Sequence, residues 1–325
     1  TRRLLLAAAP LLAAAALATA SLTASAYNSV VAFGDSLSDN GNLLYATGDL
    51  IPLTGAYWNG RFSNGKAAVE VLAQHLGVGL YDFAYGGAGT GFSNPQFLGT
   101  PLEPTGIRSQ VAGYLSATSG HADANSLYFV WGGPNDFLVA LGTPSPDFSS
   151  IISAGVSNLV SSVDQLYTAG ARNFLLPLMP DLGATPRALT LDGSIPGTAL
   201  ALSGLSASFN AQLASAYSGW AALHAGADIT LFDTFARQHL LLASAAGLGI
   251  TDTTTACFSG GPAKPGKLCA DPSEHFYFDD IHPSAAVHNA LGLQLAAAVP
   301  EPSTYGLMAL GLMGIALRRY RQKAA

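Results

Sequence analysis

Charged side chains are scarce in this sequence. Lys and Arg together number 14 and Asp and Glu number 20, so charged residues make up 10% of the 325 residues and the formal net charge is −6. A protein that holds nucleic acid through phosphate contacts needs a basic surface. This composition does not supply one, and nucleic-acid binding is therefore excluded.

Long apolar runs are missing from the interior of the chain and occur only near its two ends. Near the start, Arg2 and Arg3 precede an apolar stretch over residues 4–22, and residues 24–26 read ASA. This order is typical of a secretory signal peptide. We expect signal peptidase to cleave after Ala26, which leaves residues 27–298 as the main domain. The alternative is a membrane anchor that stays attached.

Near the other end, residues 300–302 read PEP, residues 305–317 are apolar, and an arginine cluster follows. The apolar run is shorter than the roughly 17–25 residues of a free-standing membrane helix. The arrangement resembles the PEP-CTERM sorting signal of some Gram-negative bacteria, which an exosortase recognises. By that resemblance, residues 299–325 are a sorting tail with a short transmembrane run, and the exported protein belongs to the cell envelope, outer surface or extracellular matrix. A last core helix and a plain tail anchor are the alternatives.

Cysteine is nearly absent, with two residues, and no His-Glu-x-x-His motif occurs. Two cysteines do not make a zinc site, and we predict no metal and no cofactor. Cys257 and Cys269 lie in one Gly-, Pro- and Lys-rich stretch, and in an oxidising compartment such a pair favours a local disulfide over two free thiols. Closing the loop of 13 residues, 257 to 269 inclusive, stabilises the fold by about 3 kcal/mol in the chain-entropy model.

The interior of the chain alternates short apolar runs, rich in β-branched and aromatic residues, with longer segments of helical period. The predicted strands are residues 29–33, 80–84, 126–131, 173–178 and 228–232. The predicted helices are residues 107–117, 152–166, 198–224, 234–246 and 283–297, and residues 248–275 are predicted to form a long surface loop. This alternation is typical of a parallel sheet with crossover helices, so we expect one α/β domain.

Several residues suited to ester hydrolysis follow the predicted strands. A serine that attacks an ester needs a base, a carboxylate that orients the base, and donors for the oxyanion. Ser36, Gly87 and Asn135 follow the first three predicted strands, at the sheet edge where open α/β sheets place ligands. Ser38 replaces the second glycine of a Gly-x-Ser-x-Gly elbow, so the α/β-hydrolase family is disfavoured. An ordinary turn serine is the alternative interpretation of Ser36.

Four blocks in the right order make a resemblance to the GDSL, or SGNH, hydrolase family specific. The blocks are residues 33–39 (FGDSLSD), 82–88 (DFAYGGA), 131–136 (WGGPND) and 279–283 (DDIHP). Residues 58–66 also resemble a segment common in the branch that includes lipases and haemolysin-like phospholipases. The resemblance spans residues 30–297. It implies a flavodoxin-like three-layer α/β/α sandwich with a mainly parallel five-stranded sheet.

The same resemblance implies the role of each site residue. The catalytic residues are Ser36, Asp279 and His282, and the oxyanion hole consists of Ser36, Gly87 and Asn135. Asp280 is the rival to Asp279 as the residue that orients the base, because the two are adjacent. The second block of the family usually opens with asparagine, whereas here the residue is Asp82, which puts the hydrogen bonding of that loop in doubt.

The implied function is a carboxylic ester hydrolase of esterase or lipase type that forms an acyl-enzyme on Ser36, with His282 as the base. Two alternatives use the same fold: an acyltransferase that passes the acyl group to an alcohol, and a catalytically silent surface module that binds exopolysaccharide. The implied partners are an ester substrate (a lipid, a short-chain ester or an acylated polysaccharide), signal peptidase and an exosortase-type sorting enzyme.

Overall fold

The centre of the molecule is a sheet of five parallel strands. A computed structural model describes residues 27–299, 311 and 315. The strands lie in the order β2-β1-β3-β4-β5, which is the order of flavodoxin-like folds. They are β1 (Ser29–Gly34), β2 (Gly79–Asp82), β3 (Leu127–Trp131), β4 (Asn173–Pro177) and β5 (Asp228–Phe232). All five predicted strands are present, and the predicted flavodoxin-like sheet is confirmed.

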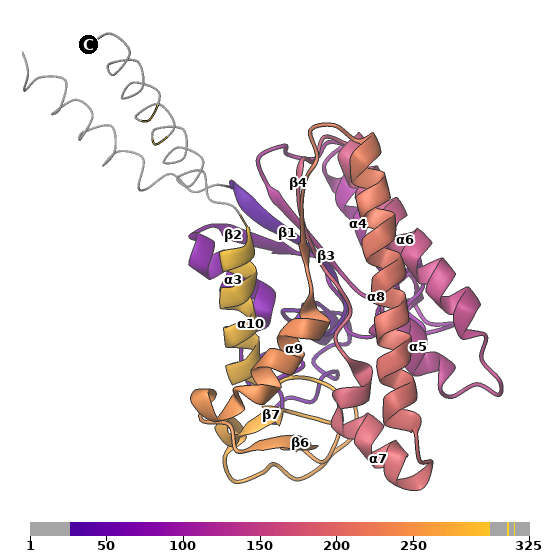
Figure 1. Ribbon diagram of the computed structural model, residues 1–325, viewed down its shortest axis with the longest axis vertical. Coiled ribbons are helices and arrows are strands. Elements are labelled where there is room, and N and C mark those ends of the chain that lie inside the picture. The colour runs from indigo at the N-terminus through magenta and orange to yellow at the C-terminus, as the bar shows by residue number, and fades with distance from the viewer. Residues whose placement is uncertain (1–26, 300–310, 312–314, 316–325) are drawn as a thin grey trace, which may run out of the picture.

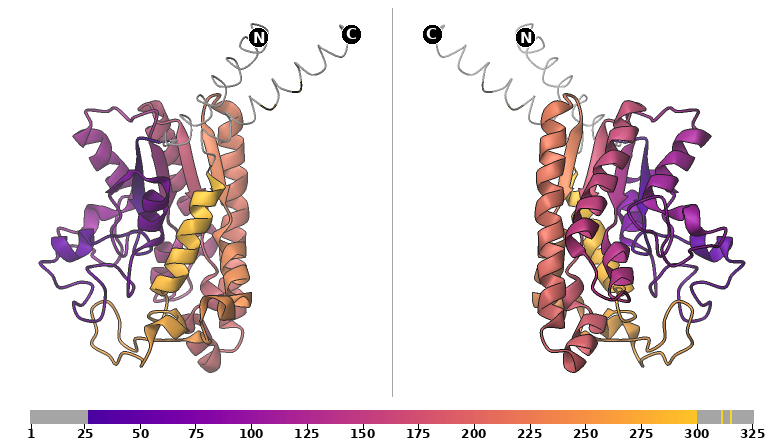
Figure 2. Two further views of the ribbon diagram at one scale, coloured as in Figure 1. Left: turned by 90° about the vertical axis from the view of Figure 1, so that its left-hand side faces the viewer. Right: turned by 90° about the vertical axis from the view of Figure 1, so that its right-hand side faces the viewer.

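Helices cover both faces of this sheet (Figures 1 and 2). One face carries α4 (Ile107–Ala117), α6 (Phe148–Thr168) and α8 (Thr198–Leu223). The other face carries α3 (Ala68–Leu76) and α10 (Ala285–Ala298). The molecule is therefore the predicted three-layer α/β/α sandwich.

Alternate residues of β1 enter the two hydrophobic cores. Val31 and Phe33 belong to the cluster that includes α4, α6 and α8, whereas Val30 and Ala32 belong to the cluster that includes α3 and α10. Successive side chains of a strand point to opposite faces, and all 6 residues of β1 are buried. A central parallel strand covered on both faces requires this near-continuous apolar sequence.

The long helices lie close to their predicted positions. α4 has the predicted bounds, and α8 ends at Leu223 instead of residue 224. The predicted helix 152–166 is the centre of α6, which starts earlier because the Asp147 side chain caps it by accepting a hydrogen bond from the Ser150 amide. α9 (Thr234–Ala243) ends before residue 246, and α10 begins two residues after Pro283 instead of at it.

Several short elements escaped the sequence prediction. They are α2 (Asn42–Ala46), α3, α5 (Pro134–Ala140), α7 (Pro186–Ser194), β6 (Asp252–Ala256), β7 (His275–Tyr277) and the 3-10 turns η1 (Glu103–Thr105), η2 (Leu182–Ala184), η3 (Ala245–Leu248) and η4 (Pro272–Glu274). β6 and β7 pair in a second, two-stranded parallel sheet, so the prediction that residues 248–275 form a loop throughout is wrong. β6 reads DTTTA and has no apolar alternation. Its hydrogen-bonding partner β7 comes only after the loop, so no local pattern indicates the strand.

The β6–β7 sheet lies at the end of the molecule where the main strands have their carboxyl ends (Figure 1). Tyr27 and Val299, the first residue and the last of the continuously described part, belong to one buried hydrophobic cluster. No helix in the described part of the chain is long and apolar enough to cross a membrane. The predicted signal peptide, residues 1–26, lies outside the described residues, as does the predicted tail 299–325 except for residues 299, 311 and 315.

Candidate active site

Ser36, His282 and Asp279 form a continuous chain of hydrogen bonds. Ser36 lies in the turn after β1, and the other two residues lie between β7 and α10. Nε2 of His282 is 2.8 Å from Oγ of Ser36, and Nδ1 of His282 is 2.7 Å from Oδ2 of Asp279. All three side chains are buried. The imidazole can therefore accept the serine proton at one nitrogen while the carboxylate holds the other.

The turn that carries His282 is built around the Asp279 carboxylate. Oδ1 of Asp279 accepts hydrogen bonds from the amides of Ile281 (3.0 Å) and His282 (2.7 Å), as in an Asx turn. Burial acts to raise the pKa of Asp279, but the neighbouring His282 and the hydrogen bonds to the carboxylate outweigh it, so the pKa lies below its ordinary value. Asp279 is thus an anion that faces His282.

Asp280 points to a different partner. Its two carboxylate oxygens accept hydrogen bonds from Arg187 Nε (2.8 Å) and Nη2 (3.0 Å), and its carbonyl oxygen accepts one from the Arg187 amide (2.8 Å). The bidentate pair holds α7 against the turn before α10. Of the two adjacent carboxylates, Asp279 is therefore the one in contact with the imidazole.

Gly87 and Asn135 meet through the residue that follows Gly87. The Asn135 side-chain amide donates a hydrogen bond to the Ala88 carbonyl oxygen (3.1 Å), and Gln96 Nε2 donates to Asn135 Oδ1 (3.3 Å). Gly87 has a φ of 82°, and a Cβ there would lie 2.9 Å from Oδ1 of Asn94, so both conformation and space favour glycine. Within the described part of the chain, no hydrogen bond takes up the amides of Ser36 and Gly87. Both amides can therefore donate to an incoming oxygen.

Asn135 is not the cap of its helix. Gly133, with a φ of 130°, is the N-cap residue of α5, and Pro134 is the first helical residue. The sharp turn at Gly133 starts α5 directly after β3 and places Asn135 in its first turn, 3% exposed. Asn135 lines the same pocket as Ser36 and His282.

Two aspartates, the buried Asp39 and the half-buried Asp82, tie the loops of the site together. Asp39 accepts hydrogen bonds from the amides of Gly41 (2.8 Å) and Gly86 (2.8 Å), and so joins the Ser36 turn to the loop of Gly87. Asp82 accepts hydrogen bonds from the amides of Asn40 (3.0 Å) and Ala84 (2.9 Å). Burial raises the pKa of Asp39 to about 6, and burial raises that of Asp82 well above its ordinary value. The residue that departs from the family pattern thus takes part in the loop hydrogen bonding.

An apolar pocket opens beside Ser36 and His282. Its polar members near the reacting atoms are Asp35, Ser36, Asn135 and His282. Most of its remaining wall is hydrophobic, with side chains that include Leu37, Trp131, Leu182, Leu241, Phe276, Val287 and Leu291. Burial raises the pKa of Asp35 to about 7. The site therefore offers a mostly apolar surface with a few polar groups beside the serine.

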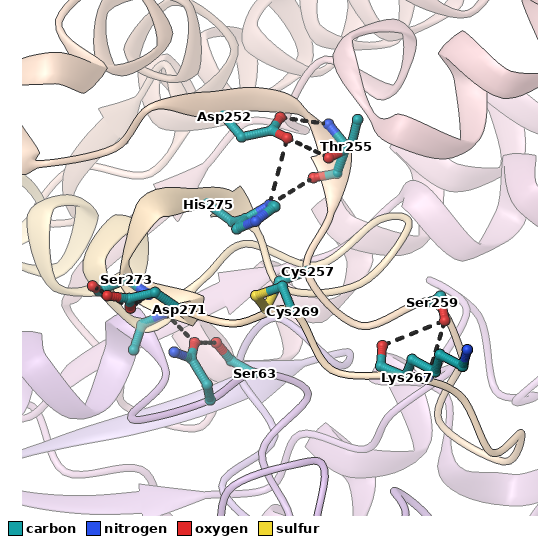
Figure 3. Close-up of a disulfide and its surroundings, with 12 residues drawn as sticks. Ser63, Asp252, Thr255, Cys257, Ser259, Lys267, Cys269, Asp271, Ser273 and His275 are labelled. Atoms are coloured by element: carbon teal, nitrogen blue, oxygen red, sulfur yellow. Dashed lines mark hydrogen bonds and ion pairs between the residues drawn. A yellow bond between two sulfur atoms is a disulfide. The ribbon is translucent and has the colours of Figure 1, made fainter.

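Cys257 and Cys269 are joined in a disulfide (Figure 3). The disulfide loop is anchored to the turn before α10, because the amide of Phe258 donates a hydrogen bond to the Phe278 carbonyl oxygen (2.7 Å). Among the described residues, His275 and the two cysteines are the one group close enough to hold a metal ion, with ligand atoms within 4.8 Å of one another. Cysteine binds a metal as a thiolate, so the disulfide removes two of the three candidate metal ligands.

Sequence reasoning missed two residues that contact the site. Gln96 holds the Asn135 side chain, and Tyr57 donates a hydrogen bond to Asp279 (2.6 Å). Tyr57 directly precedes the segment 58–66 that resembles the family, and that position is the only signal that could have directed attention to it. Nothing in the sequence near Gln96 indicates its contact.

Two known family models together match most of the chain. Residues 30–295 match the model described as GDSL-like Lipase/Acylhydrolase, and residues 298–322 match the model of the PEP-CTERM protein-sorting motif. The predicted resemblances to both families are therefore confirmed.

Three individual proteins illustrate the similarity. Lipase 1 of Photorhabdus luminescens is 36% identical over 164 residues, which cover 50% of this chain and 24% of that protein. The thermolabile hemolysin of Vibrio parahaemolyticus is 28% identical over 276 residues, which cover 80% of this chain and 61% of the hemolysin. The match thus covers less than two thirds of either relative. The crystal structure of Est24, a carbohydrate acetylesterase from Sinorhizobium meliloti, matches this structure with a TM-score of 0.42. The match covers 83% of this chain and 97% of that chain, with 17% sequence identity.

Proposed function

The chain belongs to the GDSL-like lipase/acylhydrolase family and so carries an ester-bond hydrolase domain, and we propose that this domain cleaves carboxylic esters through an acyl-enzyme on Ser36. The observation that supports this proposal best is the unbroken chain from Ser36 Oγ to His282 (2.8 Å) and from His282 to Asp279 (2.7 Å). A serine hydroxyl is a weak nucleophile until a base within hydrogen-bond reach can take its proton.

In the proposed reaction, Nε2 of His282 takes the proton of Ser36 as Oγ attacks the ester carbonyl carbon. Asp279 keeps the proton on Nδ1 and stabilises the imidazolium without itself becoming protonated. The carbonyl oxygen becomes an oxyanion, which accepts hydrogen bonds from the amides of Ser36 and Gly87 and from the Asn135 side chain. Nε2 then gives its proton to the leaving alcohol as the ester C–O bond breaks.

The second half of the reaction repeats these steps with water. Nε2 takes a proton from a water molecule as its oxygen attacks the acyl carbon, and the proton returns to Ser36 Oγ as the acid leaves. The pocket beside Ser36 has hydrophobic side chains such as Leu182, Leu241 and Phe276, and its lining favours an uncharged acyl group over a charged one. We therefore assign the acyl part of the ester to this pocket.

The C-terminal residues bear on where the reaction takes place. The chain carries a PEP-CTERM sorting motif over residues 298–322, which implies an exosortase-type sorting system. We propose that signal peptidase removes residues 1–26 and that the domain acts on esters at the cell envelope or outside the cell. Mass spectrometry of the protein recovered from the producing cells tests this, and an intact N-terminus on envelope-associated protein would contradict it.

The decisive test of the reaction is a panel of esters of graded acyl length, measured with wild-type protein and with Ser36→Ala. We expect the variant to lose at least about 10³-fold in kcat/KM, and we expect a fluorophosphonate probe to label wild-type protein at Ser36. Equal turnover by Ser36→Ala would contradict the assignment of the nucleophile. Transfer of the acyl group to added glycerol in preference to water would instead make the domain an acyltransferase.

A further inference from the structure

We propose that Tyr57 is a positioning residue that holds the Asp279 carboxylate in place for His282. The inference rests on the proposed function, because it concerns the same hydrogen-bonded chain. The hydroxyl of Tyr57 donates to Oδ2 of Asp279 at 2.6 Å. This is the oxygen that lies 2.7 Å from Nδ1 of His282. One carboxylate oxygen is therefore shared between the phenol and the imidazole.

Tyr57 is the only one of the carboxylate's hydrogen-bond donors in the described structure that comes from outside its own turn. Oδ1 of Asp279 is taken by the amides of Ile281 and His282, and Oδ2 by the His282 ring and Tyr57. The donors at Ile281 and His282 move with the turn, so they cannot fix the turn relative to the rest of the protein. Tyr57 comes from a segment 222 residues away in sequence. It can therefore set the position of the carboxylate within the fold.

The phenol remains a donor because of its surroundings. Tyr57 is 4% exposed and Asp279 is 0% exposed. Burial raises the pKa of Tyr57 far above its ordinary value, and the charge of Asp279 raises it further. A tyrosine that keeps its proton beside a buried anion forms a charge-assisted hydrogen bond, which is stronger than a neutral one.

The ring of Tyr57 is itself held by an aromatic cluster, which contains Phe258 and Phe278. The Tyr57 ring packs edge-on against Phe278 at 5.1 Å and against Phe258 at 5.6 Å between ring centroids. Phe258 directly follows Cys257 in the disulfide loop. The Leu53 amide, four residues before Tyr57, donates a hydrogen bond to the Pro262 carbonyl oxygen of the same loop (2.9 Å). The disulfide loop thus supports the residue that supports Asp279.

Other ionisable groups lie near the His282 imidazole, and a test of Tyr57 must leave their side chains and contacts unchanged. Asp280 is paired with Arg187. Asp35, whose pKa burial raises to about 7, and His288, whose pKa burial lowers to about 3, both interact electrostatically with His282. None of these groups bonds to the Tyr57 hydroxyl. Removing that hydroxyl alone therefore isolates its effect on Asp279.

The test compares Tyr57→Phe with Tyr128→Phe as a matched control. Tyr128 is also a buried tyrosine, and its hydroxyl bonds to Tyr114 and to the Asp123 carbonyl, away from Asp279. For Tyr57→Phe we expect kcat to fall about 10-fold with little change in KM. This factor is the free energy of one charge-assisted hydrogen bond expressed as a change in rate. We expect Tyr128→Phe to keep wild-type kcat.

A second readout separates positioning from a merely structural role. Without the phenol, more of the Oδ2 charge acts on His282, so the imidazolium is favoured and the base becomes free only at higher pH. The acidic limb of the kcat/KM profile is therefore expected to move to higher pH in Tyr57→Phe and to stay in place in Tyr128→Phe. If the role of Tyr57 is purely structural, the unfolding temperature of both variants falls and the pH profile of kcat/KM moves in neither.

A third readout does not depend on turnover. The proton between His282 Nδ1 and Asp279 can be followed by NMR, and we expect its resonance to shift in Tyr57→Phe and not in Tyr128→Phe. If the wild-type protein hydrolyses no ester, the proposed function fails, and this resonance still decides the role of Tyr57. An unchanged resonance with an unchanged pH profile overturns the inference. If Tyr57→Phe does not fold, Phe258→Leu replaces it, because this variant keeps the phenol but loosens its packing. We expect Phe258→Leu to move the resonance in the same direction by a smaller amount. No shift in that variant also overturns the inference.

Discussion

Asp280 is paired with Arg187 through two hydrogen bonds of 2.8 and 3.0 Å, while its neighbour Asp279 contacts His282. The two carboxylates are adjacent in sequence, yet they serve different parts of the fold. Asp279 is fully buried, whereas the Asp280 side chain is 39% exposed and its Arg187 partner 37% exposed. Exposed pairs of this kind contribute little to stability.

This difference predicts opposite outcomes for two otherwise identical substitutions. Asp279→Asn is expected to lower kcat by about 10⁴-fold, because the amide favours the wrong imidazole tautomer. Asp280→Asn removes only a half-exposed ion pair, so we expect kcat near that of the wild type and a loss of at most about 1 kcal/mol in unfolding free energy. Steady-state kinetics and denaturant unfolding measure both. Similar losses of kcat in the two variants would refute the assignment of Asp279.

Asn135→Ala tests the oxyanion donors. Because the side-chain amide is proposed to bind the oxygen only as it becomes charged, we expect kcat to fall about 10²–10³-fold with KM nearly unchanged. Asn158→Ala is the control, since Asn158 is also an asparagine on a helix but bonds to Thr90 (3.2 Å) outside the site. A rise in KM with kcat unchanged in Asn135→Ala would show that the residue binds the substrate equally in its ground state.

The double variant Cys257→Ser, Cys269→Ser tests the disulfide. The unfolded chain gains the freedom of a loop that the bond closes over a sequence separation of 12, so the unfolding free energy is expected to fall by about 3 kcal/mol. Urea unfolding with and without a reducing agent measures this: reduced wild-type protein should match the variant, and the variant should not respond to the reductant. Equal stability of oxidised and reduced wild-type protein would contradict the prediction.

Asp82→Asn tests the half-buried carboxylate at the family's asparagine position. Burial raises the pKa of Asp82 well above the ordinary value of 3.8, so the folded protein binds this proton more tightly than the unfolded chain does. The associated stability is fully present below that ordinary value and is lost as pH rises through the raised pKa. Asparagine cannot ionise, so we expect the unfolding free energy of the variant relative to wild type to increase between pH 4 and pH 8.

The control for this titration is Asp228→Asn, at the exposed start of β5. Unfolding curves at several pH values should show a wild-type slope of stability against pH in Asp228→Asn and a flatter slope in Asp82→Asn. The same slope in all three proteins would mean that Asp82 does not change its protonation on unfolding.

Much of the fold follows from local sequence. Residues 30–33 of β1 and all of β3 are apolar runs because both faces of these strands are covered, and such runs are visible without any tertiary information. β6 is different, because its threonines pair only with β7, which follows the disulfide loop. Short helices such as α5 escaped prediction because one or two turns carry too little periodic pattern to stand out.

The site divides in the same way. Ser36 and His282 lie in short ordered blocks, so both could be proposed from the sequence. The contact of Tyr57 with Asp279 spans 222 residues and that of Gln96 with Asn135 spans 39, and no spacing rule connects such partners. The choice between Asp279 and Asp280 depends on Arg187, which lies 93 residues from Asp280. Only the folded arrangement contains that information.

The hydrogen bond between Ser36 and His282 joins two residues that are 246 positions apart. A ribosome delivers the chain from its N-terminus, so Ser36 is present early and His282 arrives only when the domain is nearly complete. A fragment that ends before the turn that carries His282 contains Ser36 but lacks both Asp279 and His282. The proposed site is thus completed only when the turn before α10 has been made.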